Sequence, residues 1–260
     1  MARLRDSGHG YDFLPASGRH AAAVLARPGH QIQRVELAAP VVHELAFELI
    51  AQHLRDLGLP GGALCALELR SPAQFSDPDF ADHHRRYRSA LAQLGIEVDD
   101  RTNPIARSNA VPTVDPPVDV SVHAFSHVVP VVEYEGGGLA RLERTFVVSG
   151  SGEVPEDTDR YADHIVARGD LSPEGLTRKI RWVVAEMKRR LHAIKSSWAD
   201  VTRTQVYCTR DVGSLLPVEV QDVTGRDIDW FACQPPVVEL EFEMDCRRTG
   251  VEVILEPAVS

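Results

Sequence analysis

The chain has 260 residues, of which 43% are hydrophobic and 25% are charged, and its formal net charge at pH 7 is −10. This length suits one large globular domain or two smaller ones, and the acidic balance argues against a nucleic-acid groove or an anionic membrane surface. No stretch reaches the length of a membrane span, and the start MARLRDSGHGYDF has no apolar signal core. We therefore expect a cytoplasmic protein that binds neither membranes nor nucleic acid.

The four cysteines form no Cys-x-x-Cys pair, and three of them lie in apolar runs. Such thiols are typical of small buried side chains in a reducing compartment, and not of a disulfide framework or a zinc site. The cysteines are Cys65, Cys208, Cys233 and Cys246.

The first half of the chain predicts two strands, a helix, a strand, a second helix and two further strands. These elements are expected at 21–26, 31–40, 40–59, 63–71, 77–95, 106–114 and 118–129. Pro40 suits a first helical turn, and Gly58 with the PGG at 60–62 ends that helix. The inward positions expected are Val42, Leu45, Leu49 and Leu57 in the first helix and Phe80, Tyr87, Leu91 and Leu94 in the second.

The second half of the chain repeats the order of strands and helices that is expected in the first half. A hairpin is expected over 128–150, turning at Gly136–Gly138, and then a long helix over 172–195 with Ser172 as N-cap. Strand 200–211, segment 212–223 and a final strand pair, 235–245 and 250–255, complete it. The inward face of the long helix is expected to carry Leu176, Ile180, Val183, Val184, Met187, Leu191 and Ile194.

The repeated order predicts an α+β protein built from two domains of like design, residues 1–127 and 128–260. Long helices after strand hairpins disfavour a doubly wound parallel sheet. The Ser-Gly-Ser-Gly at 149–152 also disfavours a nucleotide site, because no helix opens directly after it to face a phosphate.

Several motifs resemble the RidA/YjgF family of imine/enamine deaminases. They are TFVVSGSGEV at 145–154, Thr177-Arg178, Thr209-Arg210-Asp211, and the strand pair PIARSNAV and DVSVHAFS. The resemblance implies two tandem RidA-like (chorismate-mutase-like) domains, each a mixed sheet packed on one face by two helices. It also implies a homotrimer with pockets between subunits and a reaction that needs no cofactor.

The resemblance assigns site residues to both halves. Arg107 falls on the family arginine that grips the substrate carboxylate, Asn109 lies where many relatives have Cys, and His84 lies near a substrate-facing Asn. Ser149 and Gly150 match the Ser-Gly that lines the family pocket. The two halves are therefore expected to complement each other in one composite pocket.

The catalytic carboxylate is expected from the second half. Glu252 matches the family glutamate, whereas Ser121 and His123 occupy the two Glu positions of the first half. His123 is a candidate proton shuttle that replaces the lost carboxylate. The spacing of His83, His84, His123 and His127 does not support a metal site, so no metal is expected.

These residues suit hydrolysis of an imine or enamine beside a carboxylate. The planar fork of Arg pairs both carboxylate oxygens, and Glu or His activates water while Ser149 helps to orient it. We expect a hydrolytic deaminase of a small carboxylated enamine, for example an aminomuconate-type intermediate of aromatic breakdown.

Two alternatives stay open at this point. A chorismatase-like enzyme would also pair two RidA-like domains, although its dicarboxylate substrate calls for more than one well-placed Arg. A non-catalytic binding or assembly module would explain the decayed motifs of each half, and it would tolerate the loss of Arg107.

Overall fold

The computed structural model describes residues 3–17, 19–131, 144–156, 158 and 160–256. The strands are β1 (Arg5–Asp6), β2 (Tyr11–Ser17), β3 (His20–Ala26), β4 (His30–Val42), β5 (Leu64–Arg70), β6 (Ala106–Pro112), β7 (Ser121–Pro130), β8 (Phe146–Gly152), β9 (Arg203–Tyr207), β10 (Asp229–Phe231), β11 (Cys233–Gln234), β12 (Glu243–Arg248) and β13 (Val251–Leu255). The helices are α1 (His43–Asp56), α2 (Asp77–Gln93), α3 (Pro173–Ala193) and α4 (Asp222–Thr224), with short turns at Gly61–Ala63, Tyr161–Asp163, Trp198–Asp200 and Pro217–Gln221.

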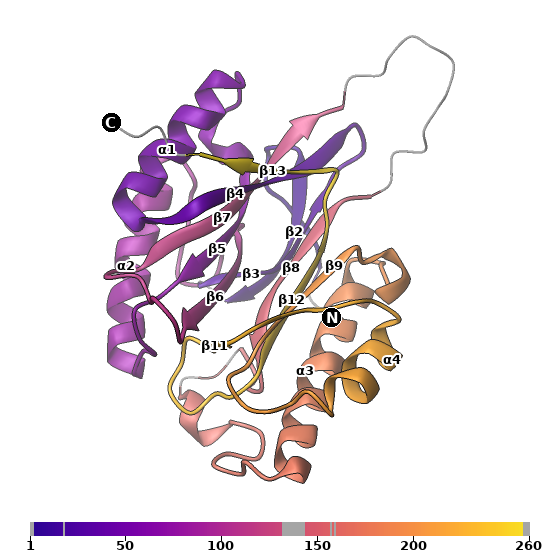
Figure 1. The fold of residues 1–260 in the computed structure, drawn as a ribbon. Coiled ribbons are helices and arrows are strands. Elements are labelled where there is room, and N and C mark those ends of the chain that lie inside the picture. Colours follow the sequence, from indigo (N-terminus) through magenta and orange to yellow (C-terminus); the bar gives the residue numbers. More distant parts are fainter. Residues whose placement is uncertain (1–2, 18, 132–143, 157, 159, 257–260) are drawn as a thin grey trace.

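All the described strands belong to one curled mixed sheet, whose order is β10-β9-β12-β8-β3-β6-β5-β7-β4-β13 (Figure 1). The sheet contains an internal repeat. β7 is antiparallel to both β4 and β5, and β12 is antiparallel to both β8 and β9. β6 runs parallel to β5 as β10 runs parallel to β9. The expected α+β architecture with two units of like design is confirmed.

The two units meet at β3. This strand pairs antiparallel with β8 and parallel with β6, where Ala21 faces Ala106. The strand β7 runs through the expected division between residues 127 and 128 and continues to Pro130, so the division of the chain into two domains stays a proposal.

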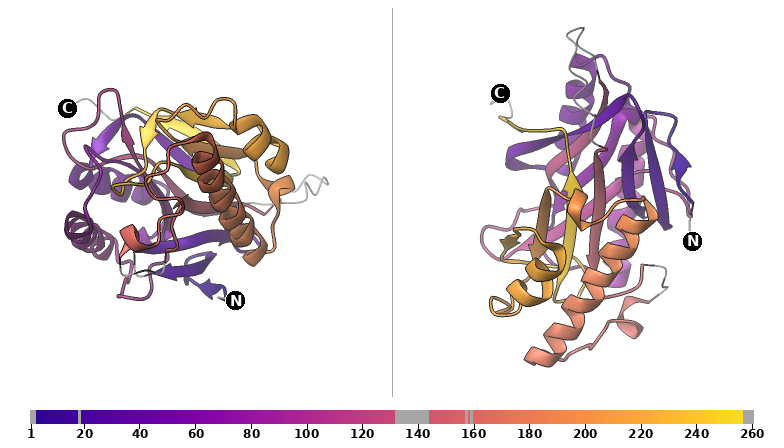
Figure 2. Two further views of the ribbon diagram at one scale, coloured as in Figure 1. Left: turned by 90° about the horizontal axis from the view of Figure 1, so that it is seen from below. Right: turned by 90° about the vertical axis from the view of Figure 1, so that its right-hand side faces the viewer.

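Each half of the sheet carries its own helices on one face, and the two helix groups stand apart in both views of Figure 2. α1 and α2 pack on β4, β5 and β7, whereas α3 packs on β3, β8, β9 and β12. The burial of these apolar faces supplies the main stabilisation of each half. The junction of β3, β6 and β8 lies between the two cores.

The helix α3 agrees with its sequence pattern. The Ser172 hydroxyl accepts a hydrogen bond from the backbone N–H of Gly175, so Ser172 is the N-cap, and Pro173 is the first helical residue. All seven expected inward residues of this segment are buried. In α2, Tyr87 and Leu91 are buried and Leu94 is half-buried, while the side chain of Phe80 lies outside the described part.

The expected inward stripe of α1 is wrong. β4 continues to Val42, so the helix begins at His43 and not at Pro40. The buried face carries His43, Ala46, Phe47, Ile50 and Leu54. Of the expected residues, Leu49 is half-buried against this core, whereas Leu45 and Leu57 are exposed.

Three expected strand pairings are also wrong. The strands β6 and β7, expected as a pair, lie on opposite sides of β5 and do not pair with each other. β8 pairs with β3 and β12, and β7 pairs with β4 and β5, so these strands do not form a hairpin; the expected turn at 136–138 lies outside the described residues. At the end of the chain, β12 and β13 do not pair with each other, because β13 crosses to lie parallel to β4. The expected strand over 235–245 begins only at Glu243.

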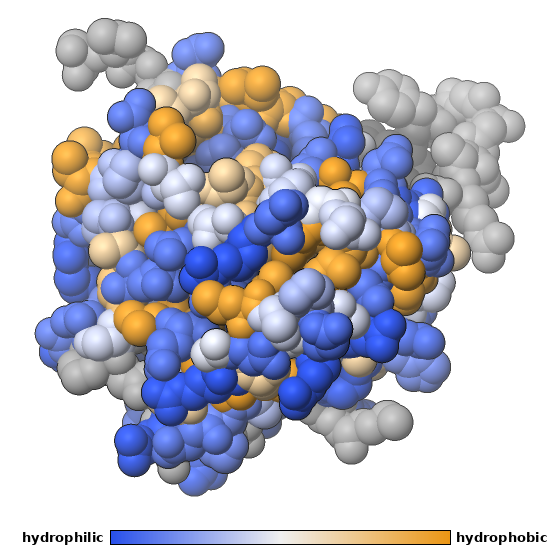
Figure 3. All heavy atoms as spheres, turned by 60° about the horizontal axis from the view of Figure 1, so that its bottom comes forward, coloured by the Kyte–Doolittle hydropathy of each residue, from blue (hydrophilic) through white to orange (hydrophobic). Residues whose placement is uncertain are grey.

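The four cysteines are free and buried, as expected. No helix among the described residues combines the length and apolarity needed to cross a bilayer. Figure 3 shows one face of the molecule as a mosaic of hydrophilic and hydrophobic residues, with a hydrophobic band near its centre.

Candidate active site

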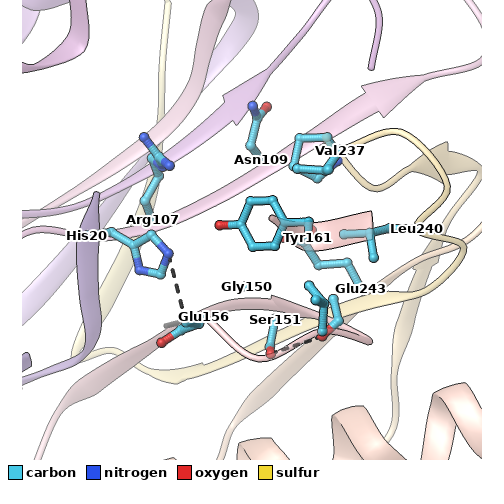
Figure 4. A pocket seen from close by; sticks show the side chains of 13 residues that line it. His20, Arg107, Asn109, Gly150, Ser151, Glu156, Tyr161, Val237, Leu240 and Glu243 are labelled. Atoms are coloured by element: carbon cyan, nitrogen blue, oxygen red, sulfur yellow. Dashed lines mark hydrogen bonds and ion pairs between the residues drawn. The ribbon is translucent and has the colours of Figure 1, made fainter. Parts of the chain in front are cut away.

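A cleft lies at the junction of the two halves and encloses about 520 Å³, its mouth included. Its walls come from β3, β6, β8 and β12 and from the segments that follow β8 and precede β12 (Figure 4). Its polar side chains include His20, Arg107, Asn109, Glu156 and Glu243, and its apolar lining includes Val154, Tyr161, Val237 and Leu240.

Arg107 supplies a buried cation from β6. Its side chain is 6% exposed, and its guanidinium carbon lies 5.0 Å from the centre of the Tyr87 ring. Burial lowers the pKa of Arg107, but a guanidinium stays protonated in proteins. The Tyr87 ring and the 3.4 Å approach of His84 Nδ1 to Nη1 fix the guanidinium, so it is preorganised for an anionic ligand.

Glu243 supplies a carboxyl group from the first residue of β12. Burial and the neighbouring Asp245 raise its pKa to about 8, against the opposing effects of the Asn109 backbone N–H, Arg190 and Arg107. The side chain is therefore largely protonated at neutral pH. A neutral carboxyl that faces a cleft can donate a proton and then act as a base, which is the requirement for general acid–base catalysis near pH 7.

Gly150 makes room for this carboxyl group. A Cβ at residue 150 would lie 2.1 Å from Glu243 Oε1 and 3.4 Å from the Ser108 Cα, so only glycine allows the carboxyl to lie against β8. The Gly150 N–H donates to the Ser108 hydroxyl at 3.1 Å, which ties β8 to β6 at this point. Gly150 thus lines the cleft, as the sequence resemblance implies.

A buried ion pair braces the segment that leads into β12. Lys179 Nζ of α3 lies 3.0 Å from Glu153 Oε1, and both side chains have no solvent exposure. Glu153 also accepts hydrogen bonds from the backbone N–H groups of Glu241, at 2.7 Å, and Phe242, at 3.1 Å. The residues directly before Glu243 are therefore held to β8 and α3.

Asn109 and Ser149 make hydrogen bonds that join the segments around the cleft, each in a different way. The backbone N–H of Asn109 donates to Glu243, while its side chain pairs with Ser71 at 2.9 and 3.0 Å. The Ser149 hydroxyl is fully buried: it accepts from the Arg107 N–H at 3.0 Å and donates to the Ala21 carbonyl at 2.5 Å. Ser149 thus joins β3, β6 and β8 behind the cleft and does not line it.

Glu252 and His123 lie outside the cleft. Glu252 is on β13, where Arg247 Nε lies 2.9 Å and Arg34 Nη1 lies 3.5 Å from its carboxylate, and these contacts lower its pKa despite burial. Burial and the charge of Arg70 lower the pKa of His123 on β7 to about 4. The structure therefore does not bring either residue to Arg107, Gly150 and Asn109.

The misplaced carboxylate has a structural explanation. β12 holds in the second half the position that β7 holds in the first, antiparallel to the two strands on either side of a long helix. Glu243 is the cross-strand partner of Tyr207 at the end of β9. In the equivalent place of the first half, Ser121 is the cross-strand partner of Arg70 at the end of β5. Glu243-Met244-Asp245 thus has the Glu-x-Glu spacing of the family strand, and this spacing is the signal that could have identified it.

Sequence reasoning also missed His20, Glu156 and Tyr161. His20 begins β3, and Glu156 and Tyr161 lie in the acidic segment after β8, with no motif around them. Figure 4 shows His20 beside Arg107 on one wall, with Glu156 below it and Glu243 on the opposite side. Among the described residues, no group of three or more His, Cys, Asp and Glu side chains could hold a metal ion.

Comparisons with known proteins point to one family. The sequence model of the family described as 2-aminomuconate deaminase CnbZ matches residues 4–253. The chain is 37% identical over 248 residues to a 2-amino-5-chloromuconate deaminase of Comamonas testosteroni, which covers 95% of this chain and 96% of that protein.

One solved structure shares the fold over most of the chain. A crystal structure of chorismatase superposes with a TM-score of 0.51 at 14% identity, over 90% of this chain and 80% of that one. The YjgF gene product of E. coli covers 46% of this chain and 88% of its own, with a TM-score of 0.30 and 13% identity. With a family match over nearly its whole length and a relative at 37% identity, the chain belongs to the 2-aminomuconate deaminase CnbZ family.

Proposed function

We propose that the chain hydrolyses 2-aminomuconate, or a close derivative of it, to the 2-oxo diacid and ammonia. The observation that carries the proposal is that Arg107 and Glu243, from different halves of the chain, line one cleft, with the pKa of Glu243 raised to about 8. Family membership supports the same substrate class.

The reaction requires one acid–base group that acts several times. The protonated Glu243 donates its proton to the enamine carbon, which converts C=C–NH2 into an iminium ion. The resulting carboxylate accepts a proton from a water molecule as that water attacks the iminium carbon. The proton then passes to the amino nitrogen, ammonia leaves as the C–N bond breaks, and the new hydroxyl returns its proton to Glu243 as the carbonyl forms.

Arg107 binds the carboxylate that is attached to the reacting carbon. A bidentate pair fixes the plane of that carboxylate and hence the position of the neighbouring C–N bond. The cleft is partly apolar, so these interactions act with little screening by water.

A diacid requires a second cation, and Arg19 is the candidate. Its guanidinium carbon lies 4.7 Å from the centre of the Tyr161 ring, which lines the cleft. The charge of Arg19 adds to the effect of burial in lowering the pKa of Arg107, and it opposes the effect of burial, which raises the pKa of Glu156. We assign the remote carboxylate of the substrate to this side of the cleft.

We place the enzyme downstream of aromatic ring cleavage, because oxidative opening of a six-membered ring yields an unsaturated six-carbon diacid. The free, buried cysteines support a reducing compartment, the cytoplasm.

We also propose a homotrimer, which is supported by the apolar surface of the edge strand β13: Val251, Val253 and Ile254 are 42%, 46% and 71% exposed. Light scattering coupled to size exclusion tests the trimer.

Ammonia release tests the function. Purified protein is mixed with freshly generated 2-aminomuconate, ammonia is measured by a coupled dehydrogenase assay, and the uncatalysed rate is subtracted. We expect turnover by the wild type, a loss of at least about 100-fold in kcat/KM for Arg107→Ala, and no change for the exposed control Arg181→Ala. Absence of turnover on this and other carboxylated enamines would refute the proposal, and chorismate would then be the next substrate to test because of the shared fold.

A further inference from the structure

His20 lies in the cleft beside Arg107, yet the roles of Arg107 and Glu243 leave it without a function (Figure 4). It is the first residue of β3, the strand that joins the two halves. Its side chain is 13% exposed, and the side chain of Glu156, which also lines the cleft, is 17% exposed.

The hydrogen bond of His20 defines which ring nitrogen carries the proton. Nδ1 lies 2.9 Å from the Ala21 carbonyl oxygen, and a carbonyl can only accept, so Nδ1 carries the hydrogen. Burial and the charges of Arg107, Arg190 and His84 hold the pKa of His20 well below its usual range, against the Ala21 carbonyl. The ring is therefore neutral, and Nε2 presents a lone pair.

Glu156 presents a second acceptor near this lone pair. Its Oε1 lies 3.9 Å from His20 Nε2, which is too far for a direct hydrogen bond. Arg190 fixes Glu156 through an ion pair, and Arg190 is itself held by the Ser149 carbonyl, at 2.9 Å, and by Glu186, at 2.9 Å. The two acceptors are therefore rigidly placed, with a gap between them that faces the cleft.

A nitrogen with two N–H bonds fits that gap. If each donor distance is about 2.9 Å, the two acceptors subtend an angle of roughly 85° at the nitrogen, so each tetrahedral N–H bond points within about 12° of the line to its acceptor. A carboxylate or a carbonyl oxygen offers no hydrogen to either acceptor, so the gap disfavours those groups.

We propose that His20 Nε2 and Glu156 Oε1 form an amine subsite, which binds the amino nitrogen of the substrate and holds it until it leaves as ammonia. This inference rests on the proposed deaminase function. The substrate carries its amino group on the carbon next to a carboxylate, and the subsite correspondingly lies next to Arg107.

The subsite also orients the reaction. When both N–H bonds point to His20 and Glu156, the nitrogen lone pair of the tetrahedral intermediate points away from them, toward the wall that carries Glu243. That is the direction from which the proton for ammonia departure arrives. Substrate binding and leaving-group activation are therefore set by the same pair of acceptors.

Two substitutions of His20 test the role of the Nε2 acceptor independently of the rest of the imidazole ring. His20→Asn keeps an amide N–H near the place of Nδ1 but has no acceptor at the position of Nε2, whereas the longer His20→Gln can place its amide oxygen there. The matched control is His192→Gln, at an exposed position of α3. Each variant is assayed for 2-aminomuconate turnover and for competitive inhibition by muconate, the same diacid without the amino group.

We expect His20→Asn to lower kcat/KM by about 10- to 100-fold, the loss of a hydrogen bond with charged character. Inhibition by muconate should stay within about threefold of wild type, since Arg107 is intact, and His20→Gln should recover most of the activity. Should His20→Asn fail to fold, Glu156→Met, which removes the second acceptor at similar side-chain length, is expected to give the same selective loss.

Unchanged turnover by His20→Asn would refute the proposed amine subsite without affecting the proposed function. A loss of muconate inhibition as large as the loss of turnover would also refute it, because it would indicate a general structural role for His20. A wild-type enzyme that releases no ammonia would instead overturn the proposed function, and the subsite with it.

Discussion

The free energy of unfolding should depend on pH through Glu243. The ordinary pKa of a glutamate is 4.5, and burial raises that of Glu243 to about 8 in the folded chain. Between these values the folded chain holds a proton that the unfolded chain has lost, so stability falls by about 1.4 kcal/mol per pH unit. From pH 4.5 to about 8 the fall is on the order of 5 kcal/mol, and above pH 8 it is complete.

Glu243→Gln replaces the protonated carboxyl by a neutral group of the same shape and removes this dependence. Urea unfolding of the two proteins from pH 5 to 9 gives the difference directly, because the titrating groups that do not interact with Glu243 largely cancel. We expect equal stability near pH 5 and a variant that is more stable by several kcal/mol at pH 9. The exposed substitution Glu48→Gln serves as the control. A stability difference that does not change with pH would show that Glu243 is ionised throughout and refute its assignment as an acid.

Three further substitutions test the walls of the cleft. Arg107→Lys keeps the charge but loses the bidentate fork, so we expect KM for the carboxylate substrate to rise about 10- to 100-fold with a smaller change in kcat, measured by steady-state kinetics. Gly150→Ala places a Cβ against the Glu243 carboxyl, so kcat should fall by at least about 100-fold while the melting temperature changes little; an active variant would contradict the geometry. Lys179→Met leaves the Glu153 charge buried without its cation, and chemical denaturation should show a loss of about 3–5 kcal/mol; an unchanged midpoint would exclude a role for the pair in stability.

The sequence predicted the elements that depend on local patterns. The N-cap and apolar face of α3 follow from a helix-period pattern, and Arg107 and Gly150 lie in short motifs, so these residues could be placed from sequence. Residues in irregular segments, such as Glu156, carried no such pattern.

Whether Glu243 or Glu252 lies in the cleft depends on which strands pair, and these pairings join residues that are far apart in the sequence. Glu243 and Glu252 both lie in short strands of alternating polarity, and β12 pairs with β8 and β9 while β13 crosses to β4. A two-residue hairpin turn or a crossover are equally compatible with the residues between them, because the tertiary contacts of each strand decide its partner. The α1 stripe was missed for a related reason: β4 extends three residues into the expected helix, which rotates the buried face.

In the proposed composite site Glu243, and not Glu252, is the catalytic carboxyl group. The most direct test compares ammonia release from 2-aminomuconate by Glu243→Gln and Glu252→Gln, two identical chemical changes on strands that are consecutive in the sequence but apart in the sheet. We predict that Glu243→Gln loses at least about 1,000-fold in kcat, since it removes the acid–base group, while Glu252→Gln stays within a few-fold of wild type. Full activity in Glu243→Gln, or the converse pattern with loss only in Glu252→Gln, would contradict this assignment.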